Sequence, residues 1–422
     1  MCGITAIIGL DGFRPERWRL EAMADAIRHR GPDDHGYYQS GPVGFGFRRL
    51  SILDLTAEGH QPMLSHDGRY AIIFNGEIYN YLELREELAA RGHRFRSTGD
   101  TEVLLAAFAE WGEACLPKLN GMWAFLIHDR QSGSLFGARD RFGVKPFYYC
   151  RTPEALLFAS ELKAFAPSGL YQPAVNWSTA GRFLHDGVMD DGVETFYAGI
   201  QHIPAGSCFA IDPRGEMSLS SYWSFPPEEP AAPADAAERF AELFEDSVRL
   251  RLRSDVPVGV CLSGGLDSTA IICAMARQRE GPAREQPLFA FSYNSAEFDE
   301  TPYLEATIRQ TGATLVNLTL SGREFWESFG AVLAAQDEPV HTMTAVVGYG
   351  LMKLAHDHGV TVILNGQGSD ETAAGYPTFF LHYWHTLLRS HRYPSALREI
   401  HRFAGVHQQP RAEAALSLLR HA

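Results

Sequence analysis

The chain has 422 residues, which is enough for two or three globular domains, each with a core of its own. Its 51 acidic residues outnumber its 37 basic ones, so the formal net charge is −14, and 45% of all residues are hydrophobic. This balance is typical of an ordinary globular protein and argues against intrinsic disorder. A net negative charge also argues against nucleic acid as a partner.

The sequence contains no run that approaches the roughly 18 apolar residues of a membrane-spanning helix. Its apolar start, residues 4–10, ends at an aspartate and has no basic segment before it. We therefore expect neither a signal peptide nor a membrane span. The six cysteines lie far apart and show neither a C-x-x-C pair nor a zinc-site spacing: Cys2, Cys115, Cys150, Cys208, Cys261 and Cys273. This usage predicts a reducing, cytoplasmic location.

The first 210 residues are rich in short apolar runs. These runs predict strands over residues 71–74, 122–128, 134–138, 146–150 and 155–160. Helical spacing predicts helices over 16–28, 82–91 and 100–112, the last with Asp100 as its N-cap. Strand-rich layers with few helices are therefore expected in this half.

Residues 224–235, SFPPEEPAAPAD, contain four prolines and almost no large apolar residue. This composition predicts a linker, so we expect one domain over residues 1–215 and another over 236–422. Strands over 256–262, 288–293, 314–320 and 361–365 alternate with helices over 236–249, 268–277, 303–310 and 344–358. Such alternation predicts a parallel α/β sheet, and a helical tail follows it from residue 379.

Cys2 is the first residue with a chemical signal. An initiator Met is normally removed before a small residue, which would leave Cys2 with a free α-amino group. An unperturbed α-amino group has a pKa of about 7.7 to 8, below the value of about 8.5 for a thiol, so it can accept the thiol proton. A lone cysteine at this position is more often just a small apolar residue, and its neighbours decide between the two interpretations.

The segment RYAIIFNGEIYN predicts a strand that runs into a tight hairpin turn at Asn75-Gly76. Such a turn would expose the Gly76 N–H beside the Asn75 carboxamide, and two neutral donors of this kind can form an oxyanion hole. Glu77 and Asp100 could bind a substrate ammonium group, and Arg49 could bind a carboxylate. Each of these charges, taken alone, is more often a solvated surface group.

Six motifs then occur in order: MCGI at 1–4, RHRGPD at 28–33, RLSILD at 49–54, NGEIYN at 75–80, GDTEV at 99–103 and RDRFGVKPFYY at 139–149. Together they resemble the class II glutamine amidotransferase domain. The resemblance implies an N-terminal-nucleophile fold, an αββα sandwich, with Cys2 as nucleophile and Asn75 and Gly76 as the oxyanion hole. It implies a set of glutamine-binding residues: Arg49, Leu50, Ser51, Ile52, Leu53, Asn75, Gly76, Glu77 and Asp100.

In the second half, SGGLDS at 263–268 follows the buried strand VPVGVCL and opens a helix. Backbone N–H groups of a glycine turn at a helix N-terminus bind anions, so we expect a phosphate-bearing ligand. The chain has no Gly-Lys pair, which excludes an ordinary P-loop. The glycines alone would also allow a merely tight turn, but the whole motif resembles the pyrophosphate-binding loop of the ATP pyrophosphatases.

A second motif, NGQGSDE at 365–371, follows a strand and so lies at the ligand-binding edge of the predicted sheet. Asp267 and Asp370 could share a Mg²⁺ ion on ATP phosphates. The whole chain resembles the glutamine-dependent asparagine synthetase family. That resemblance implies that ammonia from glutamine passes through an internal tunnel to an aspartyl adenylate formed from aspartate and ATP. It implies a set of ATP-binding residues: Leu262, Ser263, Gly264, Gly265, Asp267, Ser268, Phe291, Asn365 and Gly366.

Two features depart from the family pattern. Many members read SGEGSDE where this chain has the neutral residues Asn365 and Gln367. Only four lysines are present, Lys118, Lys145, Lys163 and Lys353, and none follows the second motif, where the family has a catalytic lysine. We expect a chain that is short at its C-terminus compared with the family. Two alternatives remain open: an amidotransferase that acts on another carboxylate, and a pseudo-ligase with glutaminase activity only. A homodimer is also left open.

Overall fold

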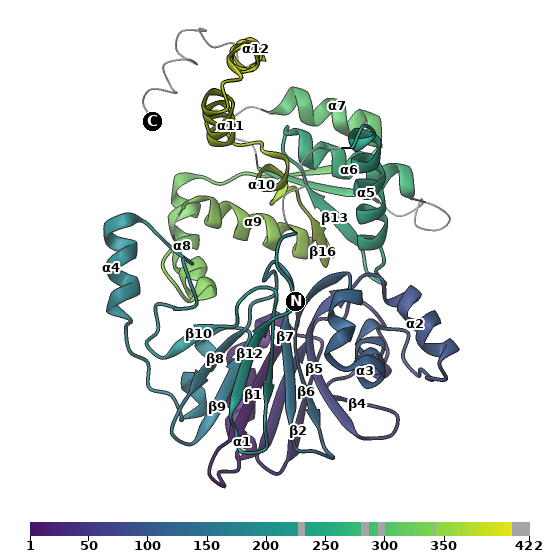
Figure 1. Ribbon diagram of the computed structural model, residues 1–422, viewed down its shortest axis with the longest axis vertical. Coiled ribbons are helices and arrows are strands. Elements are labelled where there is room, and N and C mark those ends of the chain that lie inside the picture. The colour runs from purple at the N-terminus through teal and green to yellow at the C-terminus, as the bar shows by residue number, and fades with distance from the viewer. Residues whose placement is uncertain (227–232, 280–286, 294–299, 341, 407–422) are drawn as a thin grey trace.

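The computed structural model describes residues 1–226, 233–279, 287–293, 300–340 and 342–406. The chain forms two domains, with an N-terminal two-sheet domain below and a C-terminal domain with one parallel sheet above in the view of Figure 1. Within these described ranges, we find no helix that is long and apolar enough to cross a membrane.

Six strands form the first sheet: β1 (Gly3–Gly9), β2 (Asp34–Ser40), β3 (Val43–Arg49), β8 (Tyr148–Arg151), β9 (Ala155–Ala159) and β10 (Ile200–His202). Each strand is antiparallel to its neighbours, in the order β10-β8-β9-β1-β3-β2. The central strand β1 is hydrogen-bonded on both sides, to β3 and to β9. Cys2 therefore lies directly before the start of a central strand of this sheet.

The second sheet is also antiparallel, in the order β12-β11-β7-β6-β5-β4. Its strands are β4 (Met63–Leu64), β5 (Tyr70–Ile78), β6 (Gly121–Asp129), β7 (Leu135–Arg139), β11 (Ser207–Ile211) and β12 (Met217–Ser221). Because β12 pairs with β11, the second sheet continues past residue 215, the predicted end of the first domain.

The two sheets pack face to face through alternate residues of their strands. Ile4 and Ile8 of β1 and Ile73 of β5 are buried between the sheets. On the outer faces, Ile7 and Ile72 are buried under helices. Three helices cover these faces: α1 (Arg17–Ala26) on the first sheet, and α2 (Tyr81–Ala90) and α3 (Asp100–Trp111) on the second. The predicted αββα sandwich is thereby confirmed.

The predicted hairpin turn at Asn75-Gly76 is wrong, because both residues lie inside β5. They pair with Ala124 and Trp123 of β6 in a continuous antiparallel register. Gly76 allows β5 and β6 to lie close together and does not form a turn. A Cβ atom at this position would lie 2.3 Å from the Met122 carbonyl oxygen. Asn75 is therefore held on a rigid strand, on the face that Ile73 turns toward the first sheet.

The predicted N-cap of α3 is also wrong. Gly99 is the N-cap, and Asp100 is the first residue of the helix. The Asp100 carboxylate instead accepts a hydrogen bond from the Ile78 N–H, at 2.8 Å. This bond fastens the start of α3 to the end of β5, so the side chain acts between two elements and not within one.

Four parallel strands form the sheet of the second domain: β13 (Val258–Cys261), β14 (Phe289–Tyr293), β15 (Thr314–Leu318) and β16 (Val362–Leu364). Their order is β15-β14-β13-β16, so chain order reverses between β13 and β16. Open parallel sheets bind ligands at the carboxyl ends of strands at such a switch point. Both predicted ATP motifs follow these two strands.

Helices cover both faces of this sheet: α5 (Ala236–Arg251), α6 (Leu266–Gln278), α7 (Thr301–Thr311), α8 (Gly322–Gln336) and α9 (Thr344–Asp357). One core lies between the sheet and α5, α6 and α7, and a smaller one lies under α9. The parallel α/β domain that we predicted is confirmed. Helix α8, which starts at a capping box on Ser321, was not predicted.

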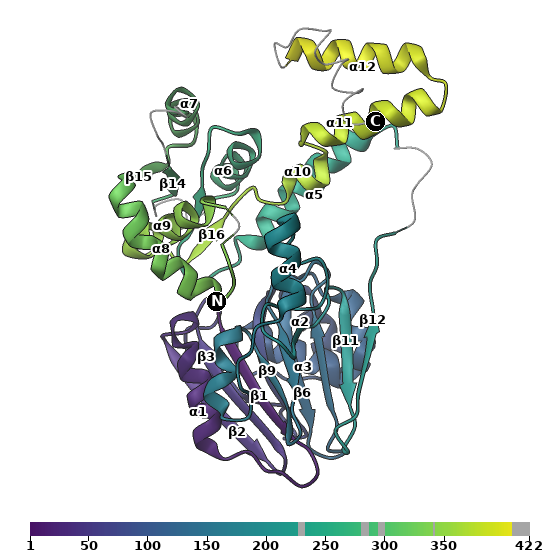
Figure 2. The same cartoon turned by 90° about the vertical axis from the view of Figure 1, so that its left-hand side faces the viewer.

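The remaining helices are α4 (Trp177–Asp186), α10 (Ser369–Ala373), α11 (Pro377–Arg389) and α12 (Tyr393–Val406). Helices α11 and α12 pack on each other around Trp384 and extend away from the parallel sheet, as Figure 2 shows. They confirm part of the predicted helical tail. The rest of that tail, residues 407–422, and residues 227–232 of the predicted linker lie outside the described residues.

Candidate active site

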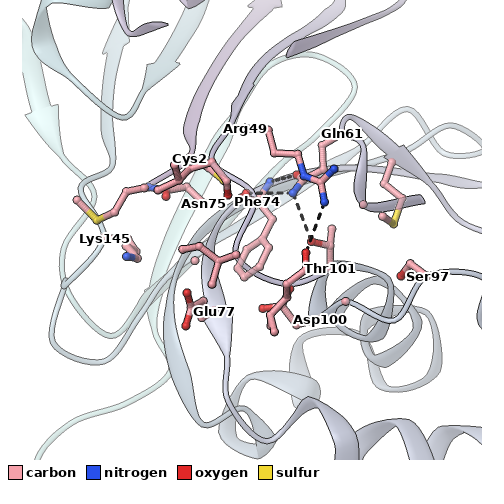
Figure 3. Close-up of a pocket in the computed structure, with 18 residues that line it drawn as sticks. Cys2, Arg49, Gln61, Phe74, Asn75, Glu77, Ser97, Asp100, Thr101 and Lys145 are labelled. Atoms are coloured by element: carbon pink, nitrogen blue, oxygen red, sulfur yellow. Dashed lines mark hydrogen bonds between the residues drawn. The ribbon is translucent and has the colours of Figure 1, made fainter. Parts of the chain in front are cut away.

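A pocket in the N-terminal domain brings the predicted glutaminase residues together (Figure 3). Nine of them line it: Cys2, Arg49, Leu50, Ile52, Leu53, Asn75, Gly76, Glu77 and Asp100. They come from the start of β1, the end of β3 and the loop after it, the end of β5 and the start of α3. Ser51 is not among the lining residues, and its N–H donates to the Asp33 carboxylate at 2.7 Å.

Cys2 is fixed at the pocket by both its side chain and its backbone. Its Sγ donates to the Leu50 carbonyl oxygen at 3.6 Å, and its own carbonyl oxygen accepts from Arg30 Nε at 2.9 Å. Burial raises the pKa of the Cys2 thiol and lowers the pKa of the neighbouring Met1 amine to about 5. The thiol is therefore protonated at rest, and a base must remove its proton before it can act as a nucleophile.

The Asn75 side chain is buried, with 1% of the residue exposed, yet neither its Oδ1 nor its Nδ2 has a hydrogen-bond partner. A buried polar group without a partner costs about 1–3 kcal/mol. The fold retains two such atoms beside Cys2, in a pocket that a ligand can enter. An amide donor free in this position suits an oxygen that gains negative charge during a reaction.

Two buried carboxylates lie on the other side of the pocket. Burial, together with the negative charge of Asp100, raises the pKa of Glu77 to about 7. Burial also raises the pKa of Asp100 to about 6, although hydrogen bonds from the Ile78 and Thr101 backbone oppose this shift. Burial outweighs the positive charges near both carboxylates, and an ammonium group bound between them would add counter-charge.

Arg49 is buried and holds the loop that follows it. Its Nη1 donates to the Thr56 carbonyl oxygen at 2.8 Å, and its Nη2 donates to the carbonyl oxygens of Leu53, at 3.4 Å, and Asp54. The guanidinium thus shapes the wall formed by Ile52 and Leu53, in addition to lining the pocket itself.

Sequence reasoning missed several lining residues: Gly59, Gln61, Met63, Phe74, Ser97, Gly99, Thr101 and Lys145. Lys145 belongs to the motif at 139–149, so that motif was a signal for it. Burial lowers the pKa of Lys145, and the nearby Glu77 opposes this shift. Gln61 carried no sequence signal; it joins Phe74 N, at 2.6 Å, to Thr101 Oγ1, at 3.3 Å.

In the second domain, the two predicted ATP loops pack against each other at the switch point. A Cβ on Gly366 would lie 2.9 Å from the Asp267 Cβ and 3.3 Å from the Ser268 N. Asn365 and Gly366 therefore lie beside the SGGLDS loop, as their placement after β16 predicts. Ser268 Oγ accepts from Ser263 N at 3.1 Å, which closes the loop on itself.

Two of the expected phosphate donors, the N–H groups of Gly264 and Gly265, have protein partners. The Gly264 N–H donates to the Glu300 carboxylate at 3.0 Å, and the Gly265 N–H donates to Ser263 Oγ at 3.2 Å. The loop thus holds an anionic group at one of its N–H donors. A phosphate group would either displace Glu300 or use the remaining donors of the loop.

Leu262 and Phe291 cannot offer their side chains to a nucleotide. Both belong to the hydrophobic cores of the domain, with 2% and 0% of the residue exposed. The Leu262 N–H donates to the Phe291 carbonyl oxygen at 2.8 Å. Contact with a nucleotide at these positions would be made by backbone atoms.

The predicted Mg²⁺ ligands come from the two packed loops. Asp267 lies in the first turn of α6 and Asp370 in the first turn of α10. The contact between Gly366 and Asp267 brings these loops together, and carboxylate oxygens are ligands that Mg²⁺ prefers. Two carboxylates on packed loops are a donor set of the chemical kind that Mg²⁺ takes.

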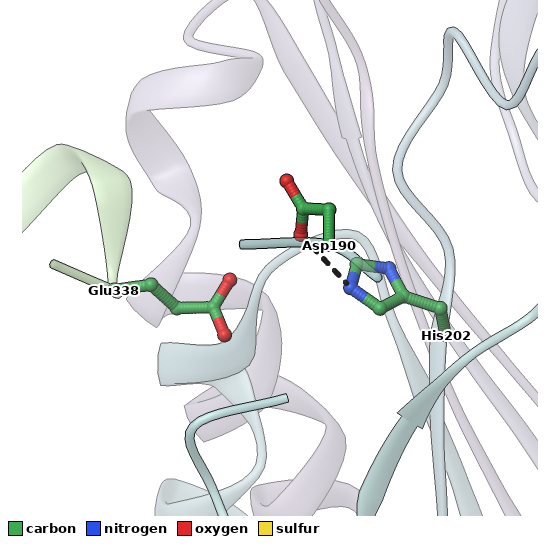
Figure 4. Close-up of side chains that lie close together, drawn as sticks. All are labelled: Asp190, His202 and Glu338. Atoms are coloured by element: carbon green, nitrogen blue, oxygen red, sulfur yellow. Dashed lines mark ion pairs between the residues drawn. The ribbon is translucent and has the colours of Figure 1, made fainter. Parts of the chain in front are cut away.

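A second group of potential metal ligands lies between the domains, where Glu338 faces Asp190 and His202 (Figure 4). Their ligand atoms lie within 4.8 Å of one another, and His202 Nε2 is 3.8 Å from Asp190 Oδ1. The Asp190 side chain is 71% exposed, and Glu338 already accepts from the Phe196 N–H at 3.0 Å. We therefore interpret this group as a polar contact between domains.

Two family models match the chain: the glutamine amidotransferase domain over residues 1–223 and the asparagine synthase domain over residues 239–421. A putative glutamine-hydrolysing asparagine synthetase from Methanocaldococcus jannaschii is 33% identical over 436 residues, which cover 95% of this chain and 80% of that protein. The chain belongs to the glutamine-hydrolysing asparagine synthetase family.

Other members of this family are similar over most of the chain. Asparagine synthetase 1 of Bacillus subtilis is 35% identical and covers 89% of this chain, which spans 59% of that protein. The amidase chyE of Penicillium rubens is 28% identical and covers 90% of this chain, which spans 60% of that protein. The chain thus spans about three fifths of the length of these two relatives.

The buried carboxylates lead to a prediction on pH. Below pH 7 Glu77 takes up a proton, and the pocket loses the charge that binds an ammonium group, so glutamine should bind about tenfold more weakly at pH 6 than at pH 8. Calorimetry on the Cys2→Ala variant measures this without turnover. In Glu77→Gln, binding should be weak and nearly independent of pH. Equal affinity of the Cys2→Ala protein at both pH values would contradict the role of Glu77.

The free Asn75 amide leads to a second prediction. Asn75→Ala should lower kcat for glutamine hydrolysis by about 10²–10³ and change KM little, because an oxyanion donor acts chiefly in the transition state. Its melting temperature should not fall, since the amide has no partner to lose. Arg49→Ala should mainly raise KM, since it loosens the wall of the pocket. The opposite pattern in steady-state kinetics would overturn both roles.

Proposed function

We propose that the N-terminal domain hydrolyses glutamine at Cys2 and that the C-terminal domain uses the ammonia to amidate a carboxylate activated by ATP. Aspartate is the proposed acceptor, so the product would be asparagine. The observation that carries the first half is the unpartnered Asn75 amide in one pocket with Cys2, Glu77 and Asp100. That set offers a nucleophile, an oxyanion donor and two carboxylates for one substrate ammonium group.

In this reaction the Cys2 thiolate attacks the carboxamide carbon of glutamine. The α-amino group of Cys2, free once Met1 has been removed, takes the thiol proton and later gives a proton to the departing ammonia. Asn75 Nδ2 and the Gly76 N–H stabilise the oxyanion of the tetrahedral intermediate. Water then attacks the thioester, which releases glutamate and restores the thiol. Glu77 and Asp100 hold the substrate ammonium throughout.

In the second domain, a substrate carboxylate oxygen attacks the α-phosphorus of ATP, and pyrophosphate leaves. Ammonia then attacks the acyl carbon of the adenylate, and AMP leaves as the amide forms. The loop 263–268 and the loop after β16 would hold the phosphates, with Asp267 and Asp370 as ligands for Mg²⁺. The bound ion would neutralise phosphate charge.

A different acceptor is the second candidate. Asn365 and Gln367 are neutral where many family members carry an acidic residue. A relative named as an amidase, from Penicillium rubens, also shares this architecture. A third candidate is a protein that retains glutaminase activity alone. Exchange of labelled pyrophosphate into ATP separates the three. Exchange that depends on aspartate supports the first candidate, exchange that depends on another acid supports the second, and no exchange with any acid supports the third.

Cys2→Ala tests the proposed division of labour. It should abolish glutamine hydrolysis, because no other group in the pocket is an equivalent nucleophile. Amide formation from added ammonia should persist, since that chemistry belongs to the other domain. Glutamate release and product formation are measured separately. Residual hydrolysis at the wild-type rate would show that Cys2 is not the nucleophile.

Asp267→Asn tests the nucleotide site. The wild-type protein should bind ATP in a Mg²⁺-dependent way, and the substitution should weaken that binding because it removes one negative ligand of the ion. Glu300→Gln is the matched comparison: it changes a carboxylate that contacts the loop but is not proposed to bind Mg²⁺. An ATP affinity that is insensitive to both Mg²⁺ and Asp267→Asn would contradict the assignment.

A further inference from the structure

Residues 251–255, from the last residue of α5 into the loop before β13, belong to the synthetase domain but contact the amidotransferase domain at alternate residues. The Arg251 guanidinium lies over the Tyr79 ring, 4.8 Å from its centre. Arg253 pairs with Glu83 at 2.5 Å and donates to the Tyr79 carbonyl oxygen at 2.6 Å. The Arg253 pairing lowers the pKa of Glu83 to about 2. These contacts lie just beyond the end of β5, which carries Asn75 and Glu77.

Asp255 makes the contact closest to the glutamine pocket. Its N–H donates to the Ile52 carbonyl oxygen at 3.0 Å, and its Oδ2 accepts from the Asp54 N–H at 2.8 Å. Ile52 and Leu53 both line the pocket. Two hydrogen bonds from one residue of the other domain therefore hold the backbone on either side of Leu53.

The loop at this point has a conformation that requires support. Asp54 is buried and left-handed, with a φ of 54°. A non-glycine residue in that region is strained and persists only where its surroundings fix it. The Asp54 carbonyl oxygen accepts from Arg49, and its Oδ2 accepts from the Thr98 N–H at 2.7 Å. Asp54 Oδ1 accepts from the Thr56 N–H and hydroxyl group. Asp255 supplies the acceptor for the Asp54 N–H, from the other domain.

We propose that Asp255 is a positioning residue for the glutamine site, so that the synthetase domain completes the pocket in which the amidotransferase domain binds its substrate. Asp255 does not line the pocket and acts only through the loop 52–54. The kinetic part of this inference rests on the proposed function. Its structural part, that the loop is held by Asp255, stands by itself.

Asp255→Ala removes the acceptor while leaving the backbone N–H in place. It should raise the KM for glutamine about tenfold and change kcat less than threefold, because the loop that forms the pocket wall loses a support while Cys2 and Asn75 stay in place. Asp255→Asn keeps an oxygen acceptor and should restore most of the affinity. Hydrogen exchange should become faster at residues 50–56 in the Ala variant and stay near wild type in the Asn variant.

Glu338→Ala is the matched control, because it removes another hydrogen bond between the domains, to the Phe196 N–H, that does not touch the pocket. It should leave the glutamine KM and the exchange at 50–56 unchanged. If it raised KM as much as Asp255→Ala, the effect would come from domain contact in general, and the proposal would fail. Unchanged exchange in Asp255→Ala would also overturn it.

A wild-type protein that hydrolyses no glutamine would refute the proposed function. The hydrogen-exchange experiment at residues 50–56 would still decide whether Asp255 holds the loop.

Discussion

One constraint governs the N-terminal domain: β5 must carry polar side chains into the space between two apolar sheets. Asn75 and Glu77 follow Ile73 by two and four residues, so all three side chains point to the same face of β5. Ile73 is buried on that face, in the core between the sheets. Burying an amide without partners and a carboxylate without full counter-charge costs free energy. The firm pairing of β5 with β6, made possible by Gly76, fixes these groups where they cannot turn to solvent.

The same constraint explains the electrostatics of the pocket. Glu77 and Asp100 have raised pKa values because they are buried, and a zwitterionic substrate brings the positive charge that they lack. Lys145, also buried, has a lowered pKa and lies at the same pocket. Lys145 and Glu77 partly compensate each other, but burial still dominates the pKa shifts of both groups and of Asp100. An ammonium group bound beside the two carboxylates would lower the cost of burying them, which is consistent with the proposed substrate.

The sequence predicts the layers and most strands because their alternation of apolar residues is regular. It misleads at Asn75-Gly76, where a dipeptide typical of turns lies in a strand: the deciding contact, between Gly76 and the Met122 carbonyl oxygen, is not local. It misplaces the role of Asp100 for the same reason, since its partner Ile78 belongs to another element. Pocket residues that lie in or next to a sequence motif can be predicted from that motif. Gln61 lies in no motif, and its role comes from hydrogen bonds to two segments that are distant in the sequence.

The arrangement of β13 connects the two halves of the proposed chemistry. Its amino end follows Asp255, which contacts the glutamine loop, and its carboxyl end leads to the loop at 263–268. Positions 255 and 263 are eight steps apart along the chain, and an extended chain rises about 3.3 Å per residue, so the segment spans at most roughly 26 Å. Ammonia released into water at neutral pH becomes ammonium, which is not a nucleophile. A pocket fastened to the very strand that carries the nucleotide loop keeps the proposed source of ammonia at a fixed distance from its acceptor, and that fixed distance is what an enclosed path between them requires.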